Sequence, residues 1–160
     1  MDSSYRNYLE RAQNEINLSE IVMELSINPA LQSSFNVTKI DTYFSSVISH
    51  AYYCIFYSAK AYLLSKGIKT NMPNEHRKTY EQFKKLVQRG IVDKELLRIY
   101  EEIFIKAETL LGIFKDEKKN RGEFTYQKLA QANKEPANKS LDNAKLFFKH
   151  IYNLCNNEIA

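Results

Sequence analysis

The stretch from residue 40 to residue 66 constrains the fold most, because apolar side chains recur on every turn of it. At helical spacing a wide apolar stripe is formed by Ile40, Phe44, Val47, Ile48, Ala51, Ile55, Ala59, Tyr62 and Leu63. Further aromatic mass comes from Tyr52, Tyr53, Phe56 and Tyr57. A helix that is apolar on most sides has to be covered by several others. The sequence therefore predicts a helical bundle with this segment at its centre.

Four other segments carry helical periodicity, which predicts helices over residues 4–25, 74–88, from 93 onward and from 136 onward. Their inward faces are expected to include Leu96, Tyr100 and Phe114 in the fourth helix, and Leu141, Phe148 and Cys155 in the last. Only 4 Gly and 3 Pro interrupt the 160 residues, too few for the turns of an all-β chain. We predict an all-α, antiparallel bundle of about five main helices, forming one domain over residues 1–160.

The helix boundaries follow from local signals. Pro29 ends the first helix, and the polar segment 29–37 is expected to be a loop. Thr38, with Asp41 three residues later, is expected to cap the central helix. Gly67 and Gly90 stand where helices end in a left-handed residue.

The composition and the motifs exclude several classes of function. The formal net charge of +4 permits an RNA partner without requiring one. The sequence has no phosphate-binding glycine loop or zinc-protease motif, and Cys54 and Cys155 form no CxxC pair. We therefore expect no metal and no cofactor. The polar start of the chain and the lack of a long apolar run predict a cytoplasmic protein without a membrane segment.

Two regions carry residues suited to nucleic-acid chemistry. In the charged segment 115–122, Lys118, Lys119 and Arg121 could attract a phosphate backbone. Tyr126 follows Arg121 by five residues, so both side chains could face one phosphate-binding pocket. The alternative interpretation of this segment is a solvated helix end. In the central helix, Tyr53 could stack on bases, although a core or interface position is the simpler interpretation.

The histidines give a weaker signal than these two regions. His50 is expected to be a hydrogen-bonded interior or groove histidine, and His76 to lie near the exposed first turn of the third helix. His150 is expected on a polar face.

The central helix resembles the signature helix of small HEPN-domain proteins, which carries the pattern Tyr-Tyr-x-x-Phe-x-x-Ala-x-x-Leu-Leu-x-x-x-Gly. The residues that follow it are Tyr52, Tyr53, Phe56, Ala59, Tyr62 (where Leu is usual), Leu63 and Gly67. The segment from His76 to Val87 resembles the family's next motif without its Gly, and Arg121 with Tyr126 matches its Arg-x-x-x-Asp-Tyr piece with Thr125 for Asp. The resemblance covers residues 40–155.

This resemblance implies a helical bundle that pairs as a dimer. Many HEPN domains are metal-independent ribonucleases of toxin–antitoxin or other defence loci, often encoded beside a minimal nucleotidyltransferase. The Arg and His of their Arg-x(4–6)-His motif meet across the dimer. Others have lost catalysis and act as nucleotide-binding or protein-interaction modules.

The sequence departs from that motif, because Tyr126 stands where the catalytic His would be. A phenol with a pKa near 10 is a poor general base at neutral pH. Either His50 or His76 could supply the base, or Arg121 could lower the pKa of Tyr126.

We therefore expect a HEPN protein that binds RNA or nucleotide phosphates at a dimer groove through Lys118, Lys119, Arg121, Tyr53, His50 and His76. It would be an endoribonuclease toxin of weak or conditional activity, with Arg121 and Tyr126 as its catalytic pair. The alternative is a non-catalytic interaction module, an antitoxin or the partner subunit of a nucleotidyltransferase. A third hypothesis makes Tyr126 a modification acceptor for that partner.

Overall fold

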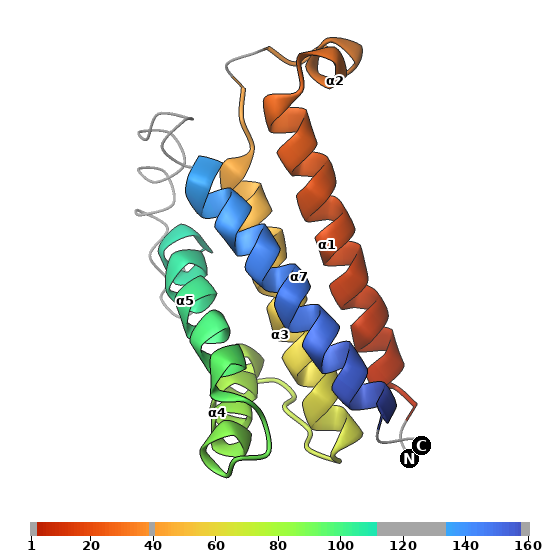
Figure 1. Cartoon of the computed structure of the whole chain (residues 1–160), viewed down its shortest axis with the longest axis vertical. Coiled ribbons are helices and arrows are strands. Elements are labelled where there is room, and N and C mark those ends of the chain that lie inside the picture. Colours follow the sequence, from red (N-terminus) through yellow and green to blue (C-terminus); the bar gives the residue numbers. More distant parts are fainter. Residues whose placement is uncertain (1–2, 39–40, 112–133, 158–160) are drawn as a thin grey trace.

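The computed structural model describes residues 3–38, 41–111 and 134–157, with the side chains of 109–111 left out. This part of the chain is all-α, without a strand, as the sequence predicts. Its six helices are α1 (Tyr5–Ile27), α2 (Pro29–Ser34), α3 (Phe44–Ser65), α4 (Glu75–Gln88), α5 (Lys94–Leu111) and α7 (Lys134–Asn157). Along the long axis α1 and α5 run one way, and α3 and α7 run the other (Figure 1).

The centre of the bundle is α3, which contacts α1, α4, α5 and α7. Its fully covered side chains include Val47, Ala51, Tyr52, Ile55 and Leu63, each with an exposed fraction of 0%. Burying one large apolar side chain contributes about 1.5–3 kcal/mol. The apolar stripe therefore holds the four surrounding helices in place, as the sequence analysis predicts.

The start of α3 differs from the prediction, because the helix begins at Phe44 and Thr38 does not cap it. The backbone N–H of Thr38 instead donates to the Asp41 carboxylate at 3.1 Å. The anchor of α3 is Ser26 on α1, whose hydroxyl accepts from the Tyr43 N–H at 2.7 Å. A long-range side-chain contact thus replaces the local cap that the sequence suggested.

The predicted loop 29–37 is also wrong in part, because residues Pro29–Ser34 form the short helix α2. Asn28 caps this helix, and its side-chain oxygen accepts from the N–H groups of Ala30 and Leu31 at 3.0 and 3.3 Å. Pro29 occupies the first turn, where its missing N–H costs no helical hydrogen bond. The same proline therefore ends α1 and begins α2.

The ends of α3 and α4 follow the predicted signals. Gly67 and Gly90 have φ values of 76° and 74°, a left-handed conformation that most side chains disfavour. The Asp93 carboxylate accepts from the Glu95 N–H at 2.8 Å and so caps the start of α5. These ends fix the turns on both sides of α4.

The buried phenylalanine of the closing helix α7 is not the one predicted. Phe147 is fully covered and its ring lies 5.5 Å from that of Phe83, whereas Phe148 is only half-buried. In α5, Leu96 and Tyr100 are buried as expected, while Phe114 lies outside the described residues.

Both cysteines lie in this core. Cys54 and Cys155 are buried free thiols, and Cys54 Sγ lies 3.9 Å from the Ala144 carbonyl oxygen. Burial raises the pKa of the Cys54 thiol well above its ordinary value.

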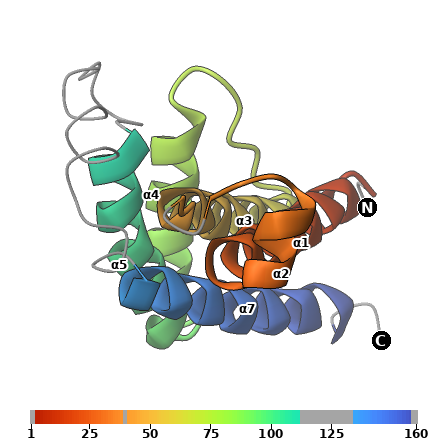
Figure 2. The same cartoon turned by 90° about the horizontal axis from the view of Figure 1, so that it is seen from above.

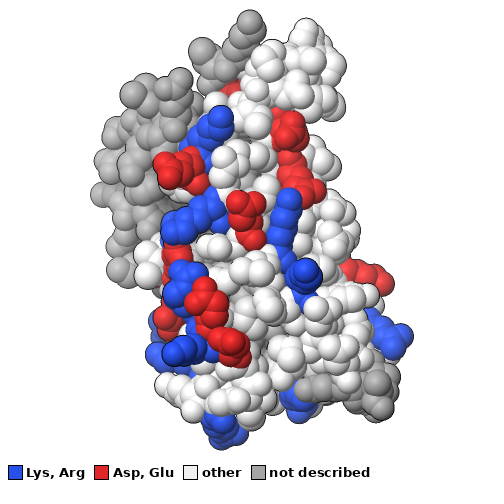
Figure 3. Space-filling model, viewed as in Figure 1, with Lys and Arg blue, Asp and Glu red and all other residues white. Residues whose placement is uncertain are grey.

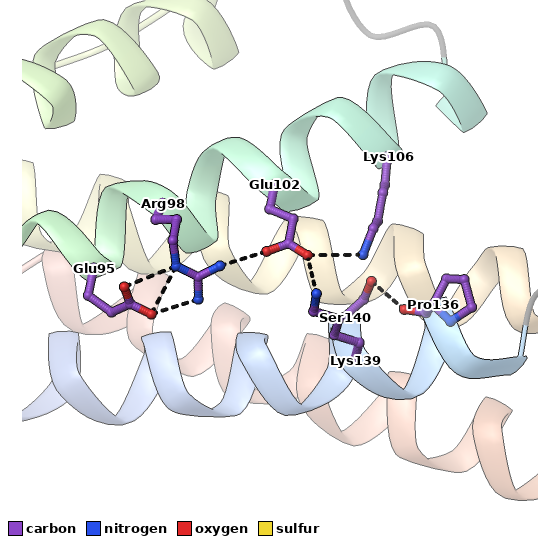
Figure 4. A network of polar contacts seen from close by, with 7 residues as sticks. All are labelled: Glu95, Arg98, Glu102, Lys106, Pro136, Lys139 and Ser140. Atoms are coloured by element: carbon purple, nitrogen blue, oxygen red, sulfur yellow. Dashed lines mark hydrogen bonds and ion pairs between the residues drawn. The ribbon is translucent and has the colours of Figure 1, made fainter.

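A polar network joins the outer faces of α5 and α7 (Figure 4). Glu102 accepts from Arg98 at 2.9 Å and from Lys139 of α7 at 2.8 Å, and Lys106 lies 3.6 Å away. The bond from Lys139 holds the pKa of Glu102 below its ordinary value. Lys145 on α7 pairs with Glu20 on α1, so charges of both signs alternate on this face (Figure 3). None of the described helices is long and apolar enough to span a bilayer.

Replacing Phe147 with Ala should lower the free energy of unfolding by about 3–5 kcal/mol, because the ring is fully covered and the void cannot close completely. Urea unfolding followed by circular dichroism measures this loss. The matched control is Leu146→Ala on the next residue, whose side chain is 43% exposed and whose loss should cost less than about 1 kcal/mol. Equal losses in the two variants would contradict the packing described for α7.

Candidate functional site

One side of α3 carries side chains of intermediate exposure. This side lies between α1 and α4, away from α7 (Figure 2). His50, Tyr53 and Tyr57 recur there at helical spacing, and each is of intermediate exposure. His50 contacts α1 and Tyr53 contacts α4. We call these three residues the α3 stripe. The other histidine and the charged side chains described below lie around it.

His76 of α4 stacks its ring on Phe56 of α3 and meets the Tyr53 ring edge-on. Its ring centroid lies 4.1 Å from that of Phe56 and 6.0 Å from that of Tyr53. Its Nδ1 shares a hydrogen bond of 2.8 Å with the Tyr52 hydroxyl. The expected exposed position for His76 is wrong, because its ring packs on Phe56 and the side chain is only partly exposed.

Burial sets the protonation of this pair. Desolvation lowers the pKa of His76, against a smaller opposing effect of the Glu75 carboxylate. Desolvation also raises the pKa of Tyr52. Both groups are therefore neutral near pH 7, and the imidazole acts as one more flat ring in the cluster.

His50 pairs with an acid from α1. Its Nδ1 lies 2.6 Å from a carboxylate oxygen of Glu15, and the two side chains are 30% and 20% exposed. A carboxylate that binds one ring nitrogen fixes the tautomer and orientation of an imidazole, which is the arrangement used to prepare a histidine for proton transfer. His50 is thus hydrogen-bonded, as expected, and partly exposed.

Two cations flank the far end of the α3 stripe. The Arg11 guanidinium lies 5.9 Å from the ring centroid of Tyr8 and 5.5 Å from that of Tyr57. Lys60 Nζ lies 5.1 Å from the Tyr8 ring and 2.6 Å from a Glu75 oxygen. Burial raises the pKa of Tyr57, with Arg11 opposing it. The stripe therefore offers rings and positive charge side by side.

The structure brings together three of the residues predicted from sequence. Tyr53 touches His76 and follows His50 by one helical turn, so all three lie along the same side of α3. The four others, Lys118, Lys119, Arg121 and Tyr126, lie outside the described residues. In the described part of the chain, no group of three or more His, Cys, Asp or Glu is placed to hold a metal ion.

Sequence reasoning missed the contribution of α1 to this site. Tyr8, Arg11 and Glu15 follow the 3-4 spacing of one helix face, directly beside the buried stripe that contains Leu9 and Ala12. That spacing was the available signal. Hydrophobic periodicity does not mark these residues, because they lie outside the apolar face of α1.

The fold and the stripe define a small all-α domain built around one aromatic helix. The family model of the HEPN domain matches residues 30–154, and the chain belongs to the HEPN-domain family. This agrees with the resemblance found in the sequence. No curated protein matches the chain.

The depressed pKa of His76 gives the protein a stability that depends on pH. The unfolded chain binds a proton at this residue more readily than the folded one, so stability is present above about pH 6.5 and falls as the pH drops below it. The variant His76→Gln should lose less stability than the wild type between about pH 7.5 and pH 5.5. Urea unfolding at the two pH values measures the difference.

His150→Gln is the control for this experiment, because His150 is exposed on α7. It should follow the wild type at both pH values. An identical pH dependence in His76→Gln and the wild type would contradict the assignment.

Proposed function

We propose that this HEPN protein binds single-stranded RNA or nucleotide phosphates along the α3 stripe. The observation that carries the proposal is the stacked pair of partly exposed rings, Tyr53 and Tyr57, with the Arg11 guanidinium beside Tyr57. Lys60 lies one helical turn further along α3, beside Phe56. Aromatic faces stack on any base, and neighbouring cations follow the phosphate backbone. The site therefore suits binding with little sequence preference.

The proposal includes a dimer groove, with two copies of the chain pairing as the family resemblance implies. Arg121, with Lys118 and Lys119, would bring further positive charge to the bound RNA. In this proposal Arg121 holds a phosphate, and Tyr126 is its catalytic neighbour.

Weak, metal-independent cleavage is part of the same proposal, and it would suit a toxin of a defence locus. Such cleavage needs a group that takes the proton from the ribose 2′-hydroxyl. The chain offers two candidates, Tyr126 and the His50 imidazole oriented by Glu15. His76 is a poorer candidate, because its Nδ1 is bound to Tyr52 and burial lowers its pKa.

The variant Tyr53→Leu should weaken the binding of a short single-stranded RNA by about 1–3 kcal/mol, because it keeps the bulk and removes the stacking face. Fluorescence anisotropy at low salt measures the affinity, and thermal unfolding shows whether the fold is intact. Tyr152→Leu is the matched control, since Tyr152 is an exposed tyrosine of α7 away from the stripe. Equal affinity of Tyr53→Leu and the wild type would exclude the stripe as the binding surface.

Arg121 and Tyr126, which lie outside the described residues, can be tested separately. Arg121→Ala should weaken RNA binding by about 1–3 kcal/mol, the scale of a charge-assisted hydrogen bond, and Arg121→Lys should recover only part of it. Tyr126→Phe should abolish cleavage of RNA in the presence of EDTA and leave binding intact. If His50→Gln abolishes cleavage and Tyr126→Phe does not, the base is the Glu15–His50 pair.

A second candidate function is a non-catalytic interaction module, such as an antitoxin or the partner of a nucleotidyltransferase. It is favoured by a hollow of about 620 Å³ between α1 and α7, lined in part by Leu9, Phe148 and Tyr152. Partner surfaces are enriched in such aromatic residues. A protein that binds no RNA, and whose association in sedimentation is weakened by Tyr152→Leu, would support this function over the first.

A further inference from the structure

A separate hollow lies where the C-terminal end of α3 meets the N-terminal end of α1. Its volume is about 380 Å³, and its walls come from α1, α3 and the segment 68–71. This is within the size range of small-ligand sites, so a phosphate with its attached sugar can be accommodated. We call it the end pocket.

The charge of the end pocket is strongly one-sided. Arg11, Lys60 and Lys69 are the charged residues that line it, and none of the lining residues is a carboxylate. The Glu75 carboxylate, which binds Lys60 at 2.6 Å, offsets one of the three charges. Two positive charges remain for a ligand. The uncharged lining residues Ser4, Asn7 and Asn71 carry side chains that can donate hydrogen bonds.

Lys60 lines the end pocket with an ammonium that is nearly buried. Its side chain is 7% exposed, between the Glu75 carboxylate and the faces of the Tyr8 and Phe56 rings. Glu75 accepts one of the three hydrogen bonds that an ammonium can donate. A nearly buried ammonium is costly when its N–H groups lack acceptors, so an anionic acceptor in the pocket would stabilise it.

Arg11 stands at the rim, with its guanidinium near the faces of Tyr8 and Tyr57. The contacts with these two rings restrict its orientation. A planar guanidinium donates two parallel hydrogen bonds to a phosphate, which a lysine cannot do. The end pocket therefore combines one such fork with two ammonium groups.

The end pocket also continues the α3 stripe. Lys60 follows Tyr57 by three residues, and Tyr8 and Arg11 contact Tyr57 and line the pocket as well. An RNA chain stacked on the stripe would thus bring one of its ends to the pocket. An internal phosphodiester carries one negative charge, whereas a terminal phosphate monoester carries nearly two at pH 7.

We propose that the end pocket binds the terminal phosphate monoester of an RNA or nucleotide that lies along the α3 stripe. The two positive charges of the pocket that Glu75 does not offset match the nearly two negative charges of a terminal phosphate monoester. This inference rests on the proposed RNA-binding function and adds to it a preference for phosphorylated ends.

The test compares three RNAs of one short sequence, carrying a 5′-phosphate, a 3′-phosphate or neither, by fluorescence anisotropy with EDTA present. We expect one phosphorylated form to bind about tenfold more tightly than the unphosphorylated RNA, the effect of one added charge-assisted hydrogen bond. Which form gains identifies the end that is bound. Inorganic phosphate should remove the gain by competing for the pocket.

Lys69→Gln and Arg11→Gln should each reduce this preference to about twofold or less, because each removes a cation from the pocket. Both side chains are exposed, so the fold should survive, and thermal unfolding checks this. The control Lys85→Gln changes the net charge equally at an exposed position of α4 outside the pocket, and should keep the preference.

The outcomes separate the inference from the function on which it rests. If all three RNAs bind equally and Tyr53→Leu weakens each of them, the end pocket has no such role and the proposed function stands. A preference that survives both Lys69→Gln and Arg11→Gln would also overturn the inference. If none of the three RNAs binds, the proposed function and the inference both fail.

Discussion

Residues 44–65 can be buried only if several other helices cover them, and this requirement sets the positions of α1, α4, α5 and α7. Small side chains at Ala51, Ala59 and Ala61, each with an exposed fraction of 0%, let the neighbours approach α3 closely. Ser19 adds a buried hydrogen bond between α1 and α3, since its hydroxyl donates to the Val47 carbonyl at 2.9 Å. The central helix is thus both the largest apolar surface of the chain and its organising element.

The location of the candidate site follows from the same constraint. Four covering helices leave one side of α3 half open, and polar and charged groups collect there because they need partners or water. Lys60 and Glu75 form their ion pair at this edge, with the Phe56 ring beside Lys60. Since Phe56 also belongs to the core, the groups around the stripe are supported by the packing of the whole bundle.

The sequence predicted what depends on periodicity and on single-residue conformational preference, namely the burial of α3, the turns at Gly67 and Gly90, and the family. It did not predict what depends on distant partners. The start of α3 is set by Ser26, seventeen residues before Tyr43, and the position of His76 by rings one helix away. In the site, Tyr53 and His50 were found because they lie on the signature helix, whereas Arg11 and Glu15 matter only once α1 is placed beside it.

The two buried thiols can report when the helical bundle opens. A thiol reacts with alkylating reagents as the thiolate, and the raised pKa of Cys54 together with its burial inside the α3–α7 contact makes that form scarce in the closed bundle. Modification of Cys54 then requires α3 to separate from α7. The rate of modification therefore measures how often this contact opens. A cysteine introduced on the surface would react first, which makes site-selective labelling feasible while Cys54 and Cys155 stay in place.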